Sequence, residues 1–102
     1  MSNEPFNGLT DAQAERLAIL IEECGEVVQA ATKVLRHGYL SENPVYPDRG
    51  NNRDMLEREL GDVMCSVALL NKAKDIRGTN VRRAEIRKGR VHADKLYTHH
   101  QP

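Results

Sequence analysis

Two pairs of acidic residues stand out because each pair lies among apolar neighbours on a predicted helix. One pair is Glu23 and Glu26, and the other is Glu59 and Asp62. Three residues of helix advance about 4.5 Å, so the members of a pair direct their oxygens into one small volume. Like charges at that spacing repel each other, and the arrangement is costly unless a cation lies between them. Magnesium, with manganese as a substitute, is the ion that such an all-oxygen ligand set favours.

The plainer interpretation is that these acids belong to solvated helix faces and form ordinary ion pairs, because charged helical positions are commonly on the surface. Two independent pairs on neighbouring helices weigh against that interpretation. Glu22 lies nearer the polar side of its helix than Glu23 or Glu26.

Helical periodicity predicts the elements that position the acids. A long helix is expected from the capping box at Thr10 and Gln13 to Gly38, followed by a loop over residues 39–53. A second helix is expected from about residue 52 to 76, and a polar third helix from about 81 to 97. The sequence therefore predicts one all-α domain over residues 1–102, with two long antiparallel helices, a third helix, and flexible ends at 1–9 and 98–102. Apolar arcs broader than two helices can cover predict a bundle completed by homo-oligomerisation.

Gly25 and Gly61 each lie between the acids of a pair, although glycine costs about 1 kcal/mol inside a helix. The sequence suggests that a neighbouring helix or a substrate approaches the backbone there. The loop at 39–53 contains two prolines and is expected to be either a plain connector or a gate. In a gate, Arg49 and Arg53 would meet phosphate oxygens.

The composition limits the classes of function. Lys and Arg total 15, and Asp and Glu also total 15, so no global charge favours binding to nucleic acid or to a membrane surface. No stretch approaches the roughly 18 apolar residues of a membrane span, and we expect a cytoplasmic protein. Cys24 and Cys65 occupy apolar helical positions, where reduced core residues are expected rather than a disulfide or a zinc site.

The segment Leu20-Ile-Glu-Glu-Cys-Gly-Glu-Val27, followed after a loop by Leu56-Glu-Arg-Glu-Leu-Gly-Asp-Val63, resembles the EExxE and ExxD signature of MazG-like pyrophosphohydrolases. The resemblance covers about residues 10–97. These proteins belong with dimeric dUTPases and phosphoribosyl-ATP pyrophosphohydrolases in the all-α NTP pyrophosphatase superfamily. The ending Tyr97-Thr-His-His100 is similar to the C-terminus of phage-type members.

The resemblance implies magnesium-dependent hydrolysis of nucleoside or deoxynucleoside triphosphates to monophosphate and pyrophosphate, in a homodimer or homotetramer. It assigns the metal to Glu23, Glu26, Glu59 and Asp62, with Glu22 as an additional acid. Basic residues of the third helix would face the site. For this role the candidates are Lys88 and Lys95, with Arg82, Arg83, Arg87 and Arg90 as further possibilities.

Three other interpretations of the sequence compete with a pyrophosphohydrolase. A di-iron carboxylate bundle would need Glu-x-x-His motifs, and no Glu of this chain has a His three residues later. A non-catalytic helical module that binds nucleotide or metal is compatible with every motif. Nucleic-acid binding through the basic third helix ranks lowest, because a solvated polar face explains those charges. Base and sugar preference are not readable from the sequence.

Overall fold

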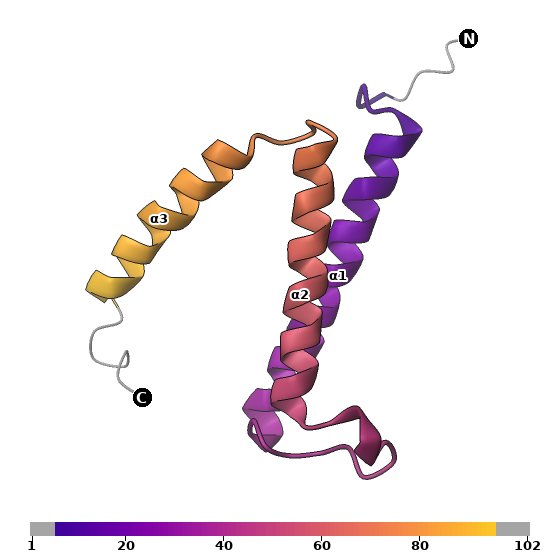
Figure 1. Cartoon of the computed structure of the whole chain (residues 1–102), viewed down its shortest axis with the longest axis vertical. Coiled ribbons are helices and arrows are strands. Elements are labelled where there is room, and N and C mark those ends of the chain that lie inside the picture. Colours follow the sequence, from indigo (N-terminus) through magenta and orange to yellow (C-terminus); the bar gives the residue numbers. More distant parts are fainter. Residues whose placement is uncertain (1–5, 96–102) are drawn as a thin grey trace.

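The described residues, 6–95 of the chain, form a helical hairpin and a third helix that diverges from it (Figure 1). In this computed structural model the elements are α1 (Asp11–His37), a 3-10 turn (Pro47–Arg49), α2 (Asn52–Lys72) and α3 (Gly78–Lys95). Within this range the only β pairing is an isolated bridge between Glu42 and Asn51. The all-α prediction with three helices is confirmed.

Both long helices begin at capping boxes, which fix their starting points. The Thr10 hydroxyl accepts from the Gln13 amide at 3.1 Å, and the Gln13 side chain accepts from the Thr10 amide at 2.8 Å. Asn51 and Asp54 make the same reciprocal pair at the start of α2, with both distances at 2.9 Å. These bonds satisfy backbone N–H groups that the first helical turn leaves without a partner.

Gly38 ends α1 as predicted. Its φ of 84° lies in the left-handed region that favours glycine, and its amide donates to the Val34 carbonyl at 2.7 Å. The following loop contains the 3-10 turn and stays connected to α1 and α2. In it, the Asn52 amide donates to the Ser41 carbonyl and the Arg53 amide to the Tyr39 carbonyl, each at 2.9 Å.

The hairpin packs through one stripe on each helix, and the residues of each stripe recur at alternating spacings of four and three. Every residue of both stripes is buried or half-buried. This spacing is the repeat that keeps one seam of a helix facing its partner. The stripe of α1 is Arg16, Leu20, Glu23, Val27, Ala30 and Val34, and that of α2 is Asn52, Leu56, Glu59, Val63, Ser66 and Leu70. We call these twelve residues the inner seam.

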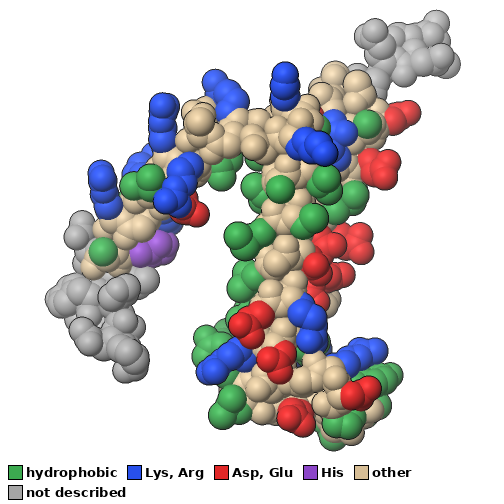
Figure 2. Space-filling view, in the orientation of Figure 1, with side chains coloured by type: hydrophobic (Ala, Val, Ile, Leu, Met, Phe, Trp, Pro, Cys, Tyr) green, Lys and Arg blue, Asp and Glu red, His purple; other side chains and the backbone are tan. Residues whose placement is uncertain are grey.

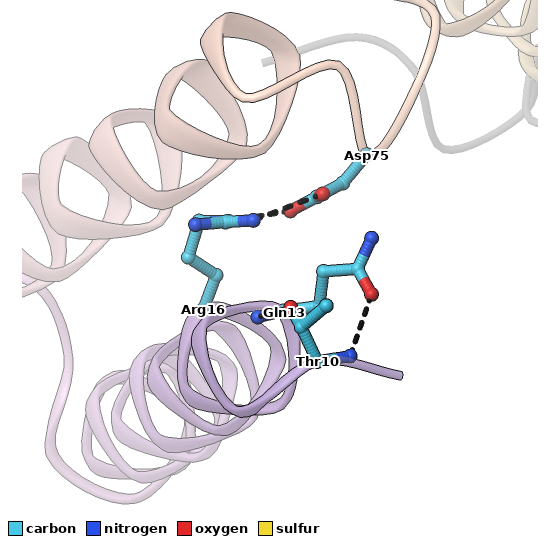
Figure 3. Close-up of polar contacts among 4 residues, drawn as sticks. All are labelled: Thr10, Gln13, Arg16 and Asp75. Carbon is cyan, nitrogen blue, oxygen red and sulfur yellow. Dashed lines mark hydrogen bonds and ion pairs between the residues drawn. The ribbon is translucent and has the colours of Figure 1, made fainter. Parts of the chain in front are cut away.

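The second helix ends earlier than its sequence suggests, at Lys72 rather than near residue 76, and the chain then turns into α3. Lys74 adopts a positive φ of 63°, which closes the helix with a residue other than glycine. The Asp75 carboxylate accepts two hydrogen bonds from the Arg16 guanidinium of α1, at 2.6 and 3.1 Å. Figure 3 shows the two side chains facing each other. The third helix begins at Gly78, whose amide donates to the Asn71 side chain at 2.9 Å.

Few side chains are fully buried in this arrangement. Ala30 and Leu70 are the buried apolar residues among the described positions, and the helix pair that packs extensively is α1 with α2. The core of the single chain is therefore thin for a domain of this length. No helix in the described part is both long and apolar enough to cross a membrane.

The expectation that both cysteines are core residues is wrong, whereas the approach of a substrate at Gly25 and Gly61 stays a prediction. Cys24 and Cys65 are free, as expected, but both are exposed rather than in the core, because neither belongs to the inner seam. A Cβ built on Gly25 or Gly61 would meet no atom within 4 Å. No described part of the same chain therefore approaches the backbone at these glycines.

Candidate functional site

The four acids of the two sequence pairs meet at the middle of the hairpin. Glu23 and Glu26 come from α1, Glu59 and Asp62 from α2, and one carboxylate oxygen of each lies within 4.8 Å of those of the other three. Glu23 and Glu59 occupy the inner seam, where the neighbouring layers hold apolar side chains. Glu26 and Asp62 each lie three residues further along and flank the seam on one face of the hairpin. The helical repeat thus builds a cluster of four carboxylates from two short motifs.

Two oxygens of this cluster are buried without a partner. The Oε2 atoms of Glu23 and Glu59 have no hydrogen-bond partner. Burial raises the pKa of Glu23, and the charges of Glu26, Asp62 and Glu22 raise it further. The pKa of Glu59 is raised as well, first by the adjoining Glu26 carboxyl, which would share a proton with it, and then by burial. Leaving buried polar atoms unsatisfied is costly, so the protein alone does not complete this site.

The donor set fits a hard divalent cation. All four groups offer oxygen, their oxygens are close enough to share one ion, and the two orphaned atoms would become ligands. A cation would also remove the repulsion that raises both pKa values. Thiol and imidazole ligands, which softer transition metals prefer, are not part of this cluster.

A hollow of about 250 Å³ opens beside the cluster on the same face of the hairpin. Glu26 and Glu59 form its acidic wall, and Lys33 and Met55 lie at its other end, with Gln29 and Ala30 between them. A lysine ammonium next to a carboxylate cluster gives a place where an anion and a cation can be held together.

A second hollow, of about 340 Å³, continues from the first, because Lys33 and Met55 line both. Arg36 and His37 add further positive or polarisable groups, and its remaining walls come from Asn52 and the loop residues Ser41, Glu42, Asn43 and Pro44. Asn52 is buried, and its side-chain amide donates to the carbonyls of Gly38 at 3.0 Å and Lys33 at 3.5 Å. Asn52 thereby ties the start of α2 to the end of α1, where this hollow is formed.

The other residues predicted for the site lie elsewhere. Glu22 is exposed and is not part of the four-acid cluster. Arg53 stacks over the Tyr39 ring at 5.1 Å, and Arg49 over Tyr46 at 4.1 Å, so both loop arginines are engaged by tyrosines. Neither arginine lines the two hollows.

Lys88 is exposed on α3, which contributes no residue to the hollow beside the acids. The positive charge that lines this hollow is Lys33 of α1. The side chain of Lys95 and the Tyr97–His100 ending lie outside the described residues.

Comparison with protein-family models matches residues 12–90 to the MazG nucleotide pyrophosphohydrolase domain. The chain belongs to the MazG family. The matched range includes both acid pairs, the loop and most of α3. No curated protein and no solved structure matches the chain.

Lys33, Arg36, His37 and Asn52 line the two hollows, and the sequence interpretation did not single them out for the site. A signal for Lys33 was present, because it lies seven residues after Glu26 and therefore on the same face of the helix. Asn52 was treated only as part of a helix start. Its inner-seam position, four residues before Leu56, could have marked it as buried.

Proposed function

We propose that this MazG-family chain is a magnesium-dependent hydrolase that cleaves nucleoside or deoxynucleoside triphosphates to the monophosphate and pyrophosphate. The observation that supports this function best is the four-carboxylate cluster with two buried, unpartnered oxygens beside a hollow that ends at a lysine. A divalent cation at Glu23, Glu26, Glu59 and Asp62, with manganese able to replace magnesium, would supply charge neutralisation on the triphosphate and on the leaving pyrophosphate.

The residues of the chain then have separate tasks. Glu23 and Glu59, held in the inner seam, fix the position of the cluster, and the exposed Asp62 lies at its open side. A water aligned by a cluster carboxylate attacks the α-phosphorus of the triphosphate, and a proton of the water passes to that carboxylate. The bond between phosphorus and the bridging oxygen breaks, and pyrophosphate leaves with that oxygen.

We place the substrate along the two connected hollows. The triphosphate lies beside the acids and reaches Lys33, whose ammonium binds a phosphate oxygen. The nucleoside extends into the larger hollow near Arg36, His37 and Asn43. Glu22, Arg53, Lys88 and Lys95 stay as further candidates for substrate contact, and the assembly is proposed to be a homodimer or homotetramer.

The experiment is product analysis with a panel of NTPs and dNTPs in the presence of magnesium, separating monophosphate, diphosphate, phosphate and pyrophosphate. The wild type should give monophosphate and pyrophosphate in equal amounts, and excess chelator should stop the reaction. Glu59→Gln should be inactive, whereas Glu57→Gln, which changes an exposed acid on the same helix, should remain active. Diphosphate with phosphate as products, or turnover in chelator, would overturn the proposal.

A non-catalytic module that binds nucleotide or metal is the second candidate, and the intact cluster supports it equally. The same assay separates the two, because such a module would bind magnesium and nucleotide without forming products. Lys33→Ala should then be measured beside Arg53→Ala. A higher KM in the Lys33 variant alone would place the phosphates on α1, and a higher KM in the Arg53 variant alone would move them to the loop.

A further inference from the structure

The buried side chain of Asn52 has one satisfied end and one unsatisfied end. The residue is 8% exposed. Its side-chain nitrogen donates to the carbonyls of Gly38 at 3.0 Å and Lys33 at 3.5 Å. Because both partners are acceptors, the nitrogen and not the oxygen of the amide must face them. The fold therefore fixes which way this amide points.

The oxygen of the same amide faces the larger hollow. Within residues 6–95, Asn52 Oδ1 accepts no hydrogen bond from another residue. The buried side-chain atoms of this range that have no partner are the Oε2 atoms of Glu23 and Glu59, so Oδ1 of Asn52 is open to solvent. The opening that Asn52 lines is the hollow of about 340 Å³. An acceptor oxygen in a fixed orientation is thus available in that hollow.

The position of Asn52 relative to the acids indicates which part of a nucleotide meets it. The α2 residues that line the two hollows are Asn52, Met55 and Glu59. Asn52 is seven residues from Glu59, which is about 10.5 Å along the helix axis. In the substrate placement given above, the phosphates lie at the acids and the nucleoside in the larger hollow. The edge of the base is the part of a nucleotide most distant from its phosphates, and so the part that extends toward Asn52.

We propose that Asn52 selects nucleotides of cytosine and adenine over those of uracil and guanine. The inference rests on the proposed function, because it uses the substrate placement given there. Cytosine and adenine carry an amino group at the edge where uracil and guanine carry a carbonyl oxygen. The amino group donates an N–H to Oδ1 of Asn52, whereas a carbonyl oxygen at that place would leave two acceptors facing each other without a hydrogen.

The bonds to α1 make this selection stringent. An asparagine that is free to rotate would turn its nitrogen toward a carbonyl oxygen and bind both kinds of base. In Asn52 the same rotation would remove the donor from the Gly38 and Lys33 carbonyls and place an oxygen against them. A site that is built around one hydrogen bond discriminates against an analogue that cannot form it.

The first test measures the binding of uncleavable nucleotides to the full-length protein by calorimetric titration with magnesium present. The probes are the α,β-methylene analogues of CTP, UTP, ATP and ITP, in which carbon replaces the oxygen between the α- and β-phosphorus. Inosine replaces guanosine because it has the same carbonyl without a second amino group. The cytidine analogue should bind at least about tenfold more tightly than the uridine analogue, and the adenosine analogue than the inosine analogue. Equal or reversed affinities, or no binding of any analogue, would overturn the proposal.

Failure of this proposal is distinguishable from failure of the proposed function, because the titration does not depend on turnover. Binding without a base preference, together with release of pyrophosphate from NTPs, would remove the selection by Asn52 and leave the hydrolysis in place. A base preference in a protein that forms no products would remove the hydrolysis and support the selection.

The second test compares variants by the ratio of the uridine to the cytidine dissociation constant. Asn52→Leu should reduce this ratio to within about twofold. Asn52→Asp keeps acceptor oxygens and should retain the preference, even where every affinity falls. The control Asn80→Leu should also retain it, because Asn80 is an exposed residue outside the two hollows, on α3, the helix that carries many of the basic side chains in Figure 2.

A purely structural Asn52 would give a different result. Asn52→Leu would then weaken both analogues by the same factor and leave the ratio at its wild-type value, which would overturn the proposal. Loss of the preference in Asn52→Asp would overturn it as well. The comparison of analogues on the wild type and on Asn52→Asp stays decisive where Asn52→Leu does not fold.

Discussion

Polar groups at the two ends of the inner seam have hydrogen-bond partners, whereas two buried carboxylate oxygens in its middle have none. At one end Arg16 and Asp75 form a two-point ion pair, and at the other the buried Asn52 donates to two carbonyls of α1. In the middle, buried oxygens of Glu23 and Glu59 have no partner. A satisfied polar group inside a fold stabilises one geometry, whereas an unsatisfied one destabilises the fold until a ligand completes it. The difference separates structural polar residues from candidate ligand-binding ones within a single seam.

Substitution of an acid in the middle of the inner seam should have the largest effect, and this effect should be on catalysis. Glu59→Gln should lower kcat/KM by about 100-fold or more, because even the outer partners of metal ligands are worth 10–100-fold. The far-ultraviolet circular dichroism should stay that of a folded helical protein, since the substitution removes a charge that the fold does not need. Wild-type turnover by this variant would remove Glu59 from the site.

At the loop end the same kind of change should affect stability more than chemistry. Asn52→Ala removes the donor to the Gly38 and Lys33 carbonyls, and we expect a loss of about 1–3 kcal/mol in the free energy of unfolding. Urea unfolding at fixed protein concentration measures this loss. An unchanged midpoint would show that these bonds contribute no net stability.

In the metal-free protein, neutralising an acid of the cluster should stabilise the fold, whereas Asn52→Ala destabilises it. Glu59→Gln should raise the melting temperature of the metal-free protein, because it removes a repelling charge from the cluster. Addition of magnesium should then stabilise the wild type and leave the variant nearly unchanged. A metal-free variant less stable than the wild type would indicate a structural role for the Glu59 charge.

The two regions should also respond to pH with opposite signs. Glu23 and Glu59 have raised pKa values in the folded state, so their contribution to stability is complete below the ordinary glutamate value and is lost as the pH rises through the raised values. Hydrogen bonding to Arg16 lowers the pKa of Asp75, so its contribution is present above the ordinary aspartate value and is lost as the pH falls through the lowered one.

Metal-free melting curves between pH 3 and pH 7 test this difference. Asp75→Asn should be less stable than the wild type at pH 7 and should approach it at low pH. The double variant Glu23→Gln/Glu59→Gln should be more stable than the wild type at pH 7 and should also approach it at low pH. Parallel curves for all three proteins would contradict the account.

The sequence predicted those features that local chemistry and helical periodicity determine. Thr10, Gln13 and Gly38 marked the ends of α1, and the spacing of Glu23, Glu26, Glu59 and Asp62 predicted the cluster. The end of α2 was placed too late because Lys74 closes the helix with a positive φ, which the residue type does not indicate.

Contacts between distant segments were harder to predict. Arg53, a sequence candidate for phosphate binding, stacks on Tyr39 in the fold, whereas Lys33, which the sequence did not single out, lines both hollows. Periodicity showed Cys24 on an apolar stripe but not that α1 has two such stripes, one inside the hairpin and one exposed.

The most direct test of the central claim is a calorimetric titration of the metal-free protein with magnesium or manganese, without nucleotide. We expect saturable binding to the wild type and to Glu57→Gln, and loss of that binding in Glu23→Gln and in Glu59→Gln. Equal binding by all four proteins, or no saturable binding by any, would contradict the claim that the unpartnered carboxylates of the inner seam form a divalent-cation site.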